Sequence, residues 1–119
     1  MEDCKYEILL ADRRGVATRC RCCGNINVCY DCFMLVFTSE NFPLFTSDLE
    51  QTYHSHQQAG GCRRLKNIFI KTPAREVSLV FCLDEMQAFL HFLKEVGQSL
   101  LRKDLAREAL QRDNYTALN

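Results

Sequence analysis

The sequence predicts a small α+β domain, in which an antiparallel sheet of about five or six strands carries two or three helices on one face. Three observations predict this class. Short runs of β-branched and aromatic residues are separated by turn residues, two later stretches keep the helical period behind a capping residue, and 47% of the 119 residues are hydrophobic. A chain of this length and composition can bury a core of its own, so we expect a single domain over residues 1–119.

The first two predicted strands lie before and at the start of the cysteine-rich part of the chain. Residues 6–10 and 16–22 follow a strand pattern, and the stretch between them from Asp12 to Gly15 is typical of a turn. We expect residues 16–32 to form a hairpin that carries five of the eight cysteines.

The remainder of the chain repeats one order of features, which predicts two ββα units at residues 33–58 and 65–100. A shift of 37 residues places the helix cap Ser47 on Asp84. Strand, strand and helix is also a common local order, so a chance likeness is the open alternative. The expected strands are residues 33–37 and 42–45 in the first unit, and residues 67–71 and 77–82 in the second.

The helix of the second unit has the stronger periodicity. It runs from Asp84 past Leu100, with apolar residues three or four positions apart. The pattern continues through Leu105 and Leu110. Residues 101–119 are therefore expected to form a C-terminal helix and tail, which either packs across the domain or pairs with another copy of the chain.

Composition argues against several classes of function. Fifteen basic and fifteen acidic residues leave no net charge at pH 7, so no field holds a polyanion and we expect no nucleic-acid partner. No apolar stretch reaches the roughly 18 residues that a membrane span requires. Residues 1–11 lack the apolar core of a signal peptide. We therefore expect a cytoplasmic protein that does not associate with membranes.

Eight cysteines are many for a reducing compartment, where they serve as core residues or as ligands in metal or redox chemistry. Two C-x-x-C pairs lie close together, and this spacing lets two thiolates on one tight turn reach the same ion. Gly24 suits the turn after the first pair. Four thiolates favour zinc. The predicted ligands of a structural zinc ion are Cys20, Cys23, Cys29 and Cys32.

A second arrangement follows if Gly24 and Asn25 are the two residues of a hairpin turn. Cys20 then lies directly opposite Cys29, and Cys22 joins them on the same face. This trio can hold a metal with a fourth ligand, act as a redox thiol pair, or bind nothing. The candidates for that fourth ligand are Asp31, His54 and His56.

No phosphate-binding loop, nucleophile elbow or pair of catalytic carboxylates is visible, so we expect a protein that is not an enzyme. The favoured hypothesis is an intracellular module that is stabilised by cysteine-bound zinc and works through contacts with a protein partner or with a second copy of itself. One alternative is a thiol redox or metal-handling protein. The other is a metal-free interaction domain whose cysteines are all structural.

With these features, the chain resembles an uncharacterised family of short bacterial proteins that contain cysteines. The shared features are a cysteine-bearing strand, then an apolar strand pair and a helix opened by Ser or Asp, then a second strand pair and helix. The likeness covers about residues 16–95, and residues after Arg102 lie outside it. It implies a domain of unknown function and supplies no catalytic or binding residues.

Overall fold

A computed structural model describes residues 4–118, with side chains described over residues 4–112. The chain divides into two compact units, each of which is described by itself. The first, here called the sheet unit, comprises Met1–Phe42 and Lys94–Asn119. The second, here called the hairpin unit, comprises Pro43–Leu93. A single domain over the whole chain stays a prediction.

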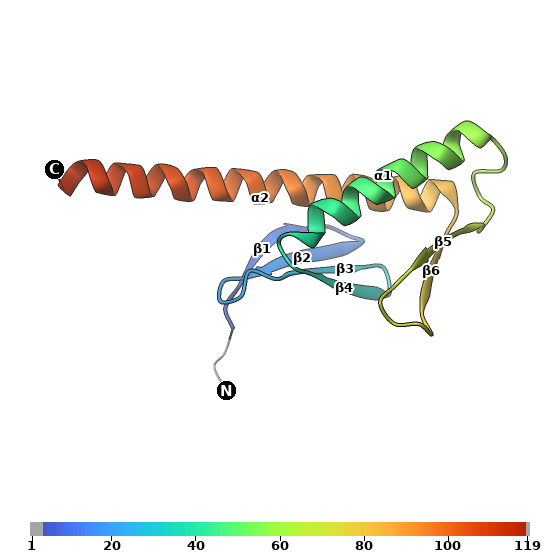
Figure 1. The fold of residues 1–119 in the computed structure, drawn as a ribbon, viewed down its shortest axis with the longest axis horizontal. Coiled ribbons are helices and arrows are strands. Elements are labelled where there is room, and N and C mark those ends of the chain that lie inside the picture. Colours follow the sequence, from blue (N-terminus) through green and yellow to red (C-terminus); the bar gives the residue numbers. More distant parts are fainter. Residues whose placement is uncertain (1–3, 119) are drawn as a thin grey trace. The chain divides into compact units, whose positions relative to one another are not determined.

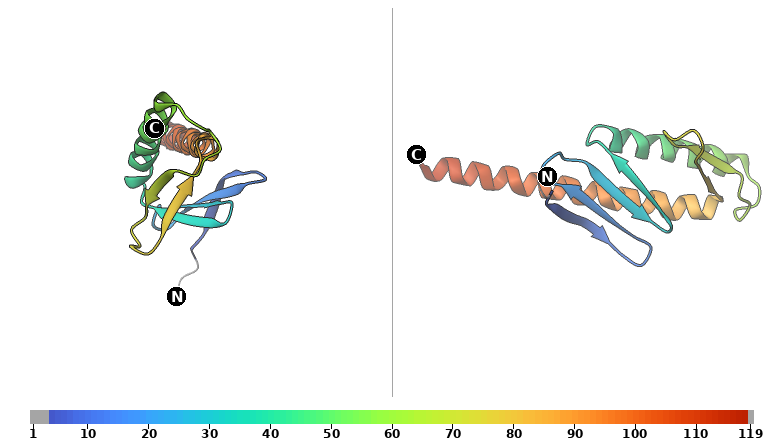
Figure 2. Two further views of the ribbon diagram at one scale, coloured as in Figure 1. Left: turned by 90° about the vertical axis from the view of Figure 1, so that its right-hand side faces the viewer. Right: turned by 90° about the horizontal axis from the view of Figure 1, so that it is seen from below.

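The sheet unit contains a four-stranded antiparallel sheet in which neighbours in sequence are neighbours in space, in the order β1-β2-β3-β4 (Figures 1 and 2). Asp12 forms the first turn, because its Oδ1 accepts hydrogen bonds from the N–H groups of Arg14 and Gly15 at 2.8 and 3.1 Å. The strands are β1 (Tyr6–Ala11), β2 (Gly15–Cys20), β3 (Ile26–Tyr30) and β4 (Phe33–Phe37). The predicted strand positions in this part of the chain are thus confirmed, apart from the end of β2, which lies at Cys20 and not at residue 22.

The two faces of this sheet differ in burial. Alternate residues of β3, namely Ile26, Val28 and Tyr30, are buried, as the alternation predicts. This inner face lies toward the middle of α2 (Leu83–Leu118), in the part that begins at Lys94 and belongs to the same unit (Figures 1 and 2). The opposite face, here called the outer face, comprises Tyr6, Ile8, Ala11, Val16, Thr18, Cys20, Asn27, Cys29, Met34 and Val36.

An ion-pair network joins the inner face to α2. Arg19 Nε is 2.7 Å from Glu7 Oε1 on the neighbouring strand, and Arg19 Nη1 is 2.8 Å from Asp104 Oδ1 on the helix. Arg107 adds a contact of 3.6 Å with Glu7. The Arg19 and Glu7 side chains are only 11% and 10% exposed, whereas Asp104 is 52% exposed. The Arg19–Glu7 ion pair therefore occupies the space at this end of the inner face that apolar side chains fill elsewhere.

The first helix begins earlier than the sequence predicts. α1 spans Asn41–Ala59, so the strand expected at residues 42–45 is wrong and Ser47 lies inside the helix. Thr38 Oγ1 accepts the N–H of Asn41 at 3.1 Å, which places the cap before the helix. Pro43 is tolerated because N–H groups in the first turn have no partner within the helix.

The hairpin unit pairs β5 (Ile68–Lys71) with β6 (Ser78–Phe81) and continues into α2. Its two predicted strands are confirmed, and Phe81 stacks on the buried Phe89 with ring centroids 5.6 Å apart. The helix cap differs from the expected Asp84. Cys82 donates its N–H to Glu85 Oε1 at 2.9 Å and accepts the Glu85 N–H on Sγ at 3.4 Å, which is a capping box with a thiol.

The first ββα unit does not form at residues 33–58 as predicted, because that range holds one strand, β4, which leads directly into α1. The six strands form two sheets, of four and two strands, rather than one. α2 runs from Leu83 to Leu118 without a break, so residues 101–118 are not a separate helix. Neither helix of the described chain is long and apolar enough to cross a membrane.

Candidate metal centre

Three thiols meet at one corner of the sheet unit. The Sγ atoms of Cys4, Cys20 and Cys22 all lie within 4.8 Å of one another. Cys20 is 2% exposed, whereas Cys4 and Cys22 are exposed. The cluster therefore has one buried sulfur and two that solvent or an ion can reach.

Strand pairing brings Cys4 to the other two cysteines. Tyr6 at the start of β1 lies opposite Cys20 at the end of β2. The pairing continues outward, because Arg21 donates its N–H to the Lys5 carbonyl at 2.7 Å. Two residues farther along each strand, this register places Cys4 opposite Cys22. Residues 16 and 18 positions apart in sequence are thus held together by the antiparallel ladder.

The turn after β2 is closed by two backbone hydrogen bonds of Cys20. Gly24 donates its N–H to the Cys20 carbonyl, and Cys20 donates its own N–H to the Asn25 carbonyl, both at 2.8 Å. Gly24 has a φ of 78°, a conformation that other residues rarely adopt. Inside this turn the N–H groups of Cys22 and Cys23 hydrogen-bond to Cys20 Sγ. Donors converging on one sulfur stabilise its thiolate.

The pKa values of the Cys20 and Cys4 thiols are shifted in opposite directions. Hydrogen bonds from Cys23 and Cys22 lower the pKa of the Cys20 thiol to about 7, against the opposing effect of burial. The hydrogen bond to Cys20 and its negative charge, with that of Cys22, raise the pKa of Cys4 to about 11. The negative charges of Cys4 and Cys20 also raise the pKa of Tyr6. The lowered pKa of Cys20 favours its thiolate, the raised pKa of Cys4 favours its thiol, and a cation at this position favours release of the Cys4 proton.

The predicted zinc quartet is not brought together. In β3, Cys29 lies opposite Val16 of β2, four residues along that strand from Cys20, which corresponds to about 13 Å. Cys32 follows β3, in the turn before β4. The expected pairing of Cys20 with Cys29 across a Gly24-Asn25 turn is therefore wrong. The last pair of the ladder is Arg19 with Ile26, and the loop between Cys20 and Ile26 holds five residues instead of two.

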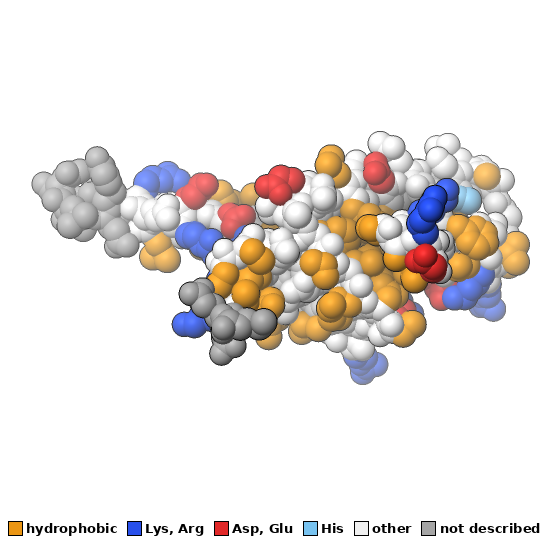
Figure 3. Space-filling model, turned by 60° about the horizontal axis from the view of Figure 1, so that its bottom comes forward, with side chains coloured by type: hydrophobic (Ala, Val, Ile, Leu, Met, Phe, Trp, Pro, Cys, Tyr) orange, Lys and Arg blue, Asp and Glu red, His pale blue; other side chains and the backbone are white. Residues whose placement is uncertain are grey.

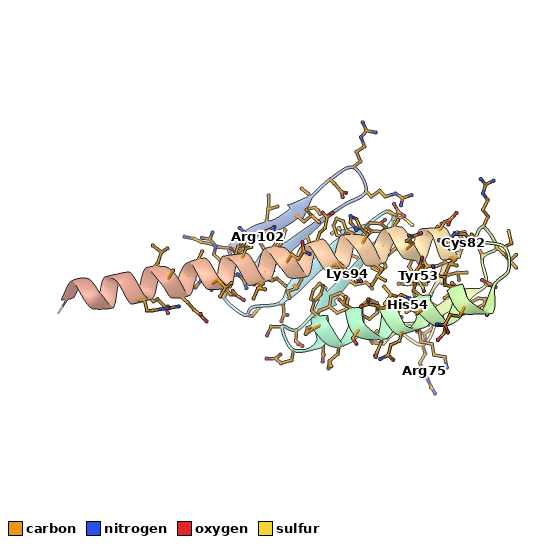
Figure 4. All side chains as sticks on the ribbon, turned by 90° about the horizontal axis from the view of Figure 1, so that it is seen from above. Tyr53, His54, Arg75, Cys82, Lys94 and Arg102 are labelled. Carbon is orange, nitrogen blue, oxygen red and sulfur yellow. The ribbon has the colours of Figure 1, made fainter. Side chains whose placement is uncertain are left out.

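Of the alternate ligands that the sequence predicts, Cys22 belongs to the cluster. Asp31 lies in the β3–β4 turn with a φ of 50°, and its Oδ1 is 4.0 Å from Arg14 Nε. His54 and His56 lie on α1 in the hairpin unit, where the exposed His54 has Glu50 at 3.8 Å (Figure 4). Neither histidine is among the residues that form the described thiol cluster.

Cys4 is the residue that sequence reasoning missed. It stands alone in the sequence, outside both C-x-x-C pairs. A signal was nevertheless present, because a hairpin that turns at residues 12–15 places residue 4 beside residues 22 and 23. The cluster thus comes from strand register and not from local spacing.

Comparison with known protein families gives a match over most of the chain. The model of a family of unknown function, DUF6686, matches residues 1–112. The chain belongs to this family. The expected resemblance to a family of unknown function is therefore confirmed, and the match extends beyond residues 16–95 to include Cys4 and the helix after Arg102. Searches of the curated proteins and of the solved structures give no match.

Proposed function

We propose that this member of the DUF6686 family is a small, non-enzymatic interaction module whose sheet is stabilised by a zinc ion bound to the thiolates of Cys4, Cys20 and Cys22. The observation that carries the proposal is the convergence of these three sulfurs within 4.8 Å. Around a tetrahedral zinc ion, sulfurs at the usual Zn–S distance of about 2.3 Å are about 3.8 Å apart. The cluster needs to contract by no more than about 1 Å to reach that geometry.

The surroundings of the cluster favour a thiolate-bound ion. Sulfur ligands are soft, and among common intracellular ions they select zinc over magnesium or calcium. The N–H groups of Cys22 and Cys23, which hydrogen-bond to Cys20 Sγ, are the kind of outer contact that orients a ligand and offsets its charge. A bound ion would fasten the start of the edge strand β1 to the turn after β2. Its role would be structural.

Zinc counting by native mass spectrometry tests this proposal. Protein refolded with zinc under reducing conditions is expected to carry one zinc ion per chain, because the three thiolates are already close together. Cys20→Ser is expected to abolish binding and Cys4→Ser to weaken it more than about 100-fold, beyond the loss usual for an outer contact. The matched control is Cys29→Ser, since Cys29 lies in the same sheet away from the cluster. A zinc-free wild-type protein contradicts the proposal, and fast alkylation of its thiols would instead favour a redox protein.

The interaction part of the proposal is supported by the outer face of the sheet. Its side chains Tyr6, Ile8, Met34 and Val36 are each more than half exposed, and Figure 3 shows hydrophobic side chains gathered over the sheet. No Asp, Glu, Lys or Arg side chain of β1–β4, all of which the structure describes, projects from this face. An antiparallel sheet that faces water usually carries polar residues there. The outer face therefore has the composition of a covered surface.

A second copy of the chain fits this face. Two charge-free faces can stack about a two-fold axis without opposing like charges, with the sheets about 10 Å apart. Four strands of about five residues give a footprint of about 300 Å² per copy, well below the roughly 800 Å² of a stable interface. The contact we propose is therefore a weak dimer that forms at high concentration.

Sedimentation equilibrium over a range of concentrations checks the dimer. The double variant Ile8→Lys/Val36→Lys is expected to weaken self-association at least about 10-fold, because it places two charges per copy in the interface. Phe69→Lys and Leu105→Lys are controls, since both side chains are exposed outside the outer face. A wild-type protein that stays monomeric at millimolar concentration, or a loss of association in the Leu105 variant alone, contradicts the assignment.

A further inference from the structure

The turn after β2 carries a fourth cysteine beside the cluster. Cys23 follows Cys22 in the turn that the Gly24 N–H closes onto the Cys20 carbonyl at 2.8 Å. Its side chain is one of the groups that lower the pKa of the Cys20 thiol. The Sγ atom of Cys23 is not one of the three that lie within 4.8 Å of one another.

We infer that Cys23 is the fourth ligand of the ion, so that Cys4, Cys20, Cys22 and Cys23 form a closed four-thiolate zinc site. This inference rests on the proposed function. It replaces Cys29 and Cys32 of the sequence prediction with Cys4 and Cys22, while Cys20 and Cys23 remain. The C-x-x-C-G segment from Cys20 to Gly24 then acts as one turn that presents its first and last cysteines to the ion.

The Cys23 side chain is free to complete the site. It is exposed, so a rotation about its χ1 angle displaces water and not core residues. The turn itself need not move, because Gly24 already supplies the left-handed conformation and both Cys20 backbone groups are already bonded across it. Hydrogen bonding from the Cys23 side chain already contributes to the lowered pKa of the Cys20 thiol.

The number of thiolates decides what the site can do. Three thiolates leave a fourth position for water, which is the arrangement of a catalytic zinc ion. Four thiolates leave none, and the site then acts only as a cross-link. The four-thiolate ion carries two negative charges, and the exposed Lys5 and Arg21 stand next to ligands in the sequence to offset them. A closed site therefore agrees with the non-enzymatic role.

X-ray absorption spectroscopy of the zinc-loaded protein tests the inference without any mutation. Wild-type protein is expected to show four sulfur neighbours at about 2.3 Å. Cys23→Ser is expected to show three sulfurs and one light atom at about 2.0 Å, with zinc binding weakened more than about 100-fold. Cys32→Ser is the matched control, because Cys32 is an equally exposed turn cysteine outside the cluster, and it is expected to match the wild type.

Each other outcome has a distinct meaning. Three sulfurs and one light atom around zinc in the wild type overturn the role of Cys23 and leave the zinc proposal standing. An unchanged spectrum and affinity in Cys23→Ser overturn it as well. A wild-type protein that binds no zinc overturns the proposed function and this inference with it.

Discussion

Because the proposed zinc ion would bind only the folded state, its removal by a chelator is expected to lower the midpoint temperature of unfolding by about 10–20 °C. A ligand that binds only the folded state stabilises it by about 4 kcal/mol when its free concentration is 1,000 times its Kd. For a chain of this length, that free energy corresponds to a shift of this size. Differential scanning calorimetry with excess zinc, and again with a chelator, measures the shift.

The apo protein is nevertheless expected to remain folded. Cys4 and Cys22 lie on the surface, while the sheet unit has an apolar core that includes Ile26, Val28 and Phe37. Zinc removal should therefore reduce the midpoint and leave the far-ultraviolet circular dichroism spectrum at 20 °C nearly unchanged. The control is Cys20→Ser, which is expected to bind no zinc and whose midpoint should therefore not respond to the chelator. Equal midpoints with and without zinc in the wild type would show that no ion stabilises the fold.

Glu7→Ala is expected to lower the free energy of unfolding by about 3–5 kcal/mol. The substitution removes the nearest partner of Arg19, whose side chain is 11% exposed, and leaves that guanidinium charge largely buried beside a shorter side chain. Arg19 Nη2 already lacks a hydrogen-bond partner among the described residues, so the site has no spare acceptor. Urea titration followed by circular dichroism measures the loss.

Asp104→Ala is the matched control for the same network. It removes the other carboxylate bound to Arg19, but Asp104 is half exposed, so its loss should cost no more than about 1 kcal/mol. Losses of similar size for the two variants would contradict the account, because they would show that burial does not set the strength of this ion pair.

The same ion pair fixes the direction of the pH dependence. Burial raises the pKa of Glu7, but the hydrogen bond and charge of Arg19, together with Lys103 and Arg107, outweigh burial and hold the pKa below its ordinary value. The stability from this shift is complete above the unfolded-state pKa of about 4.3 and is lost as the pH falls through the lower folded-state pKa. The difference in unfolding free energy between wild type and Glu7→Ala should therefore shrink below about pH 4.

Much of the fold was predictable because short-range signals decided it. The Asp12 turn, the alternation of β3 and the apolar runs of β5 and β6 are all local, and each formed where expected. The start of α1 was missed because a proline among aromatic residues is typical of a strand end. Pro43 is equally compatible with the first turn of a helix. The helix is favoured because Phe42 packs against Phe37, with the two ring centroids 5.5 Å apart.

The candidate site was half predictable for a similar reason. The density of cysteines located the right turn, and Cys20 with Cys23 came from spacing alone. Cys29 was predicted as a ligand because it belongs to the second C-x-x-C pair, but strand register places it opposite Val16. Cys4 was missed because its partners are set by the pairing of β1 with β2, and a bulge between Ile8 and Leu10 shifts that pairing by one residue.

Anomalous diffraction at the zinc absorption edge, from crystals grown with zinc and a reductant, tests the central claim most directly. The account predicts one strong peak about 2.3 Å from the sulfurs of Cys4, Cys20 and Cys22. A peak beside Cys29 or Cys32, or a zinc-saturated crystal with no peak at the cluster, would contradict it.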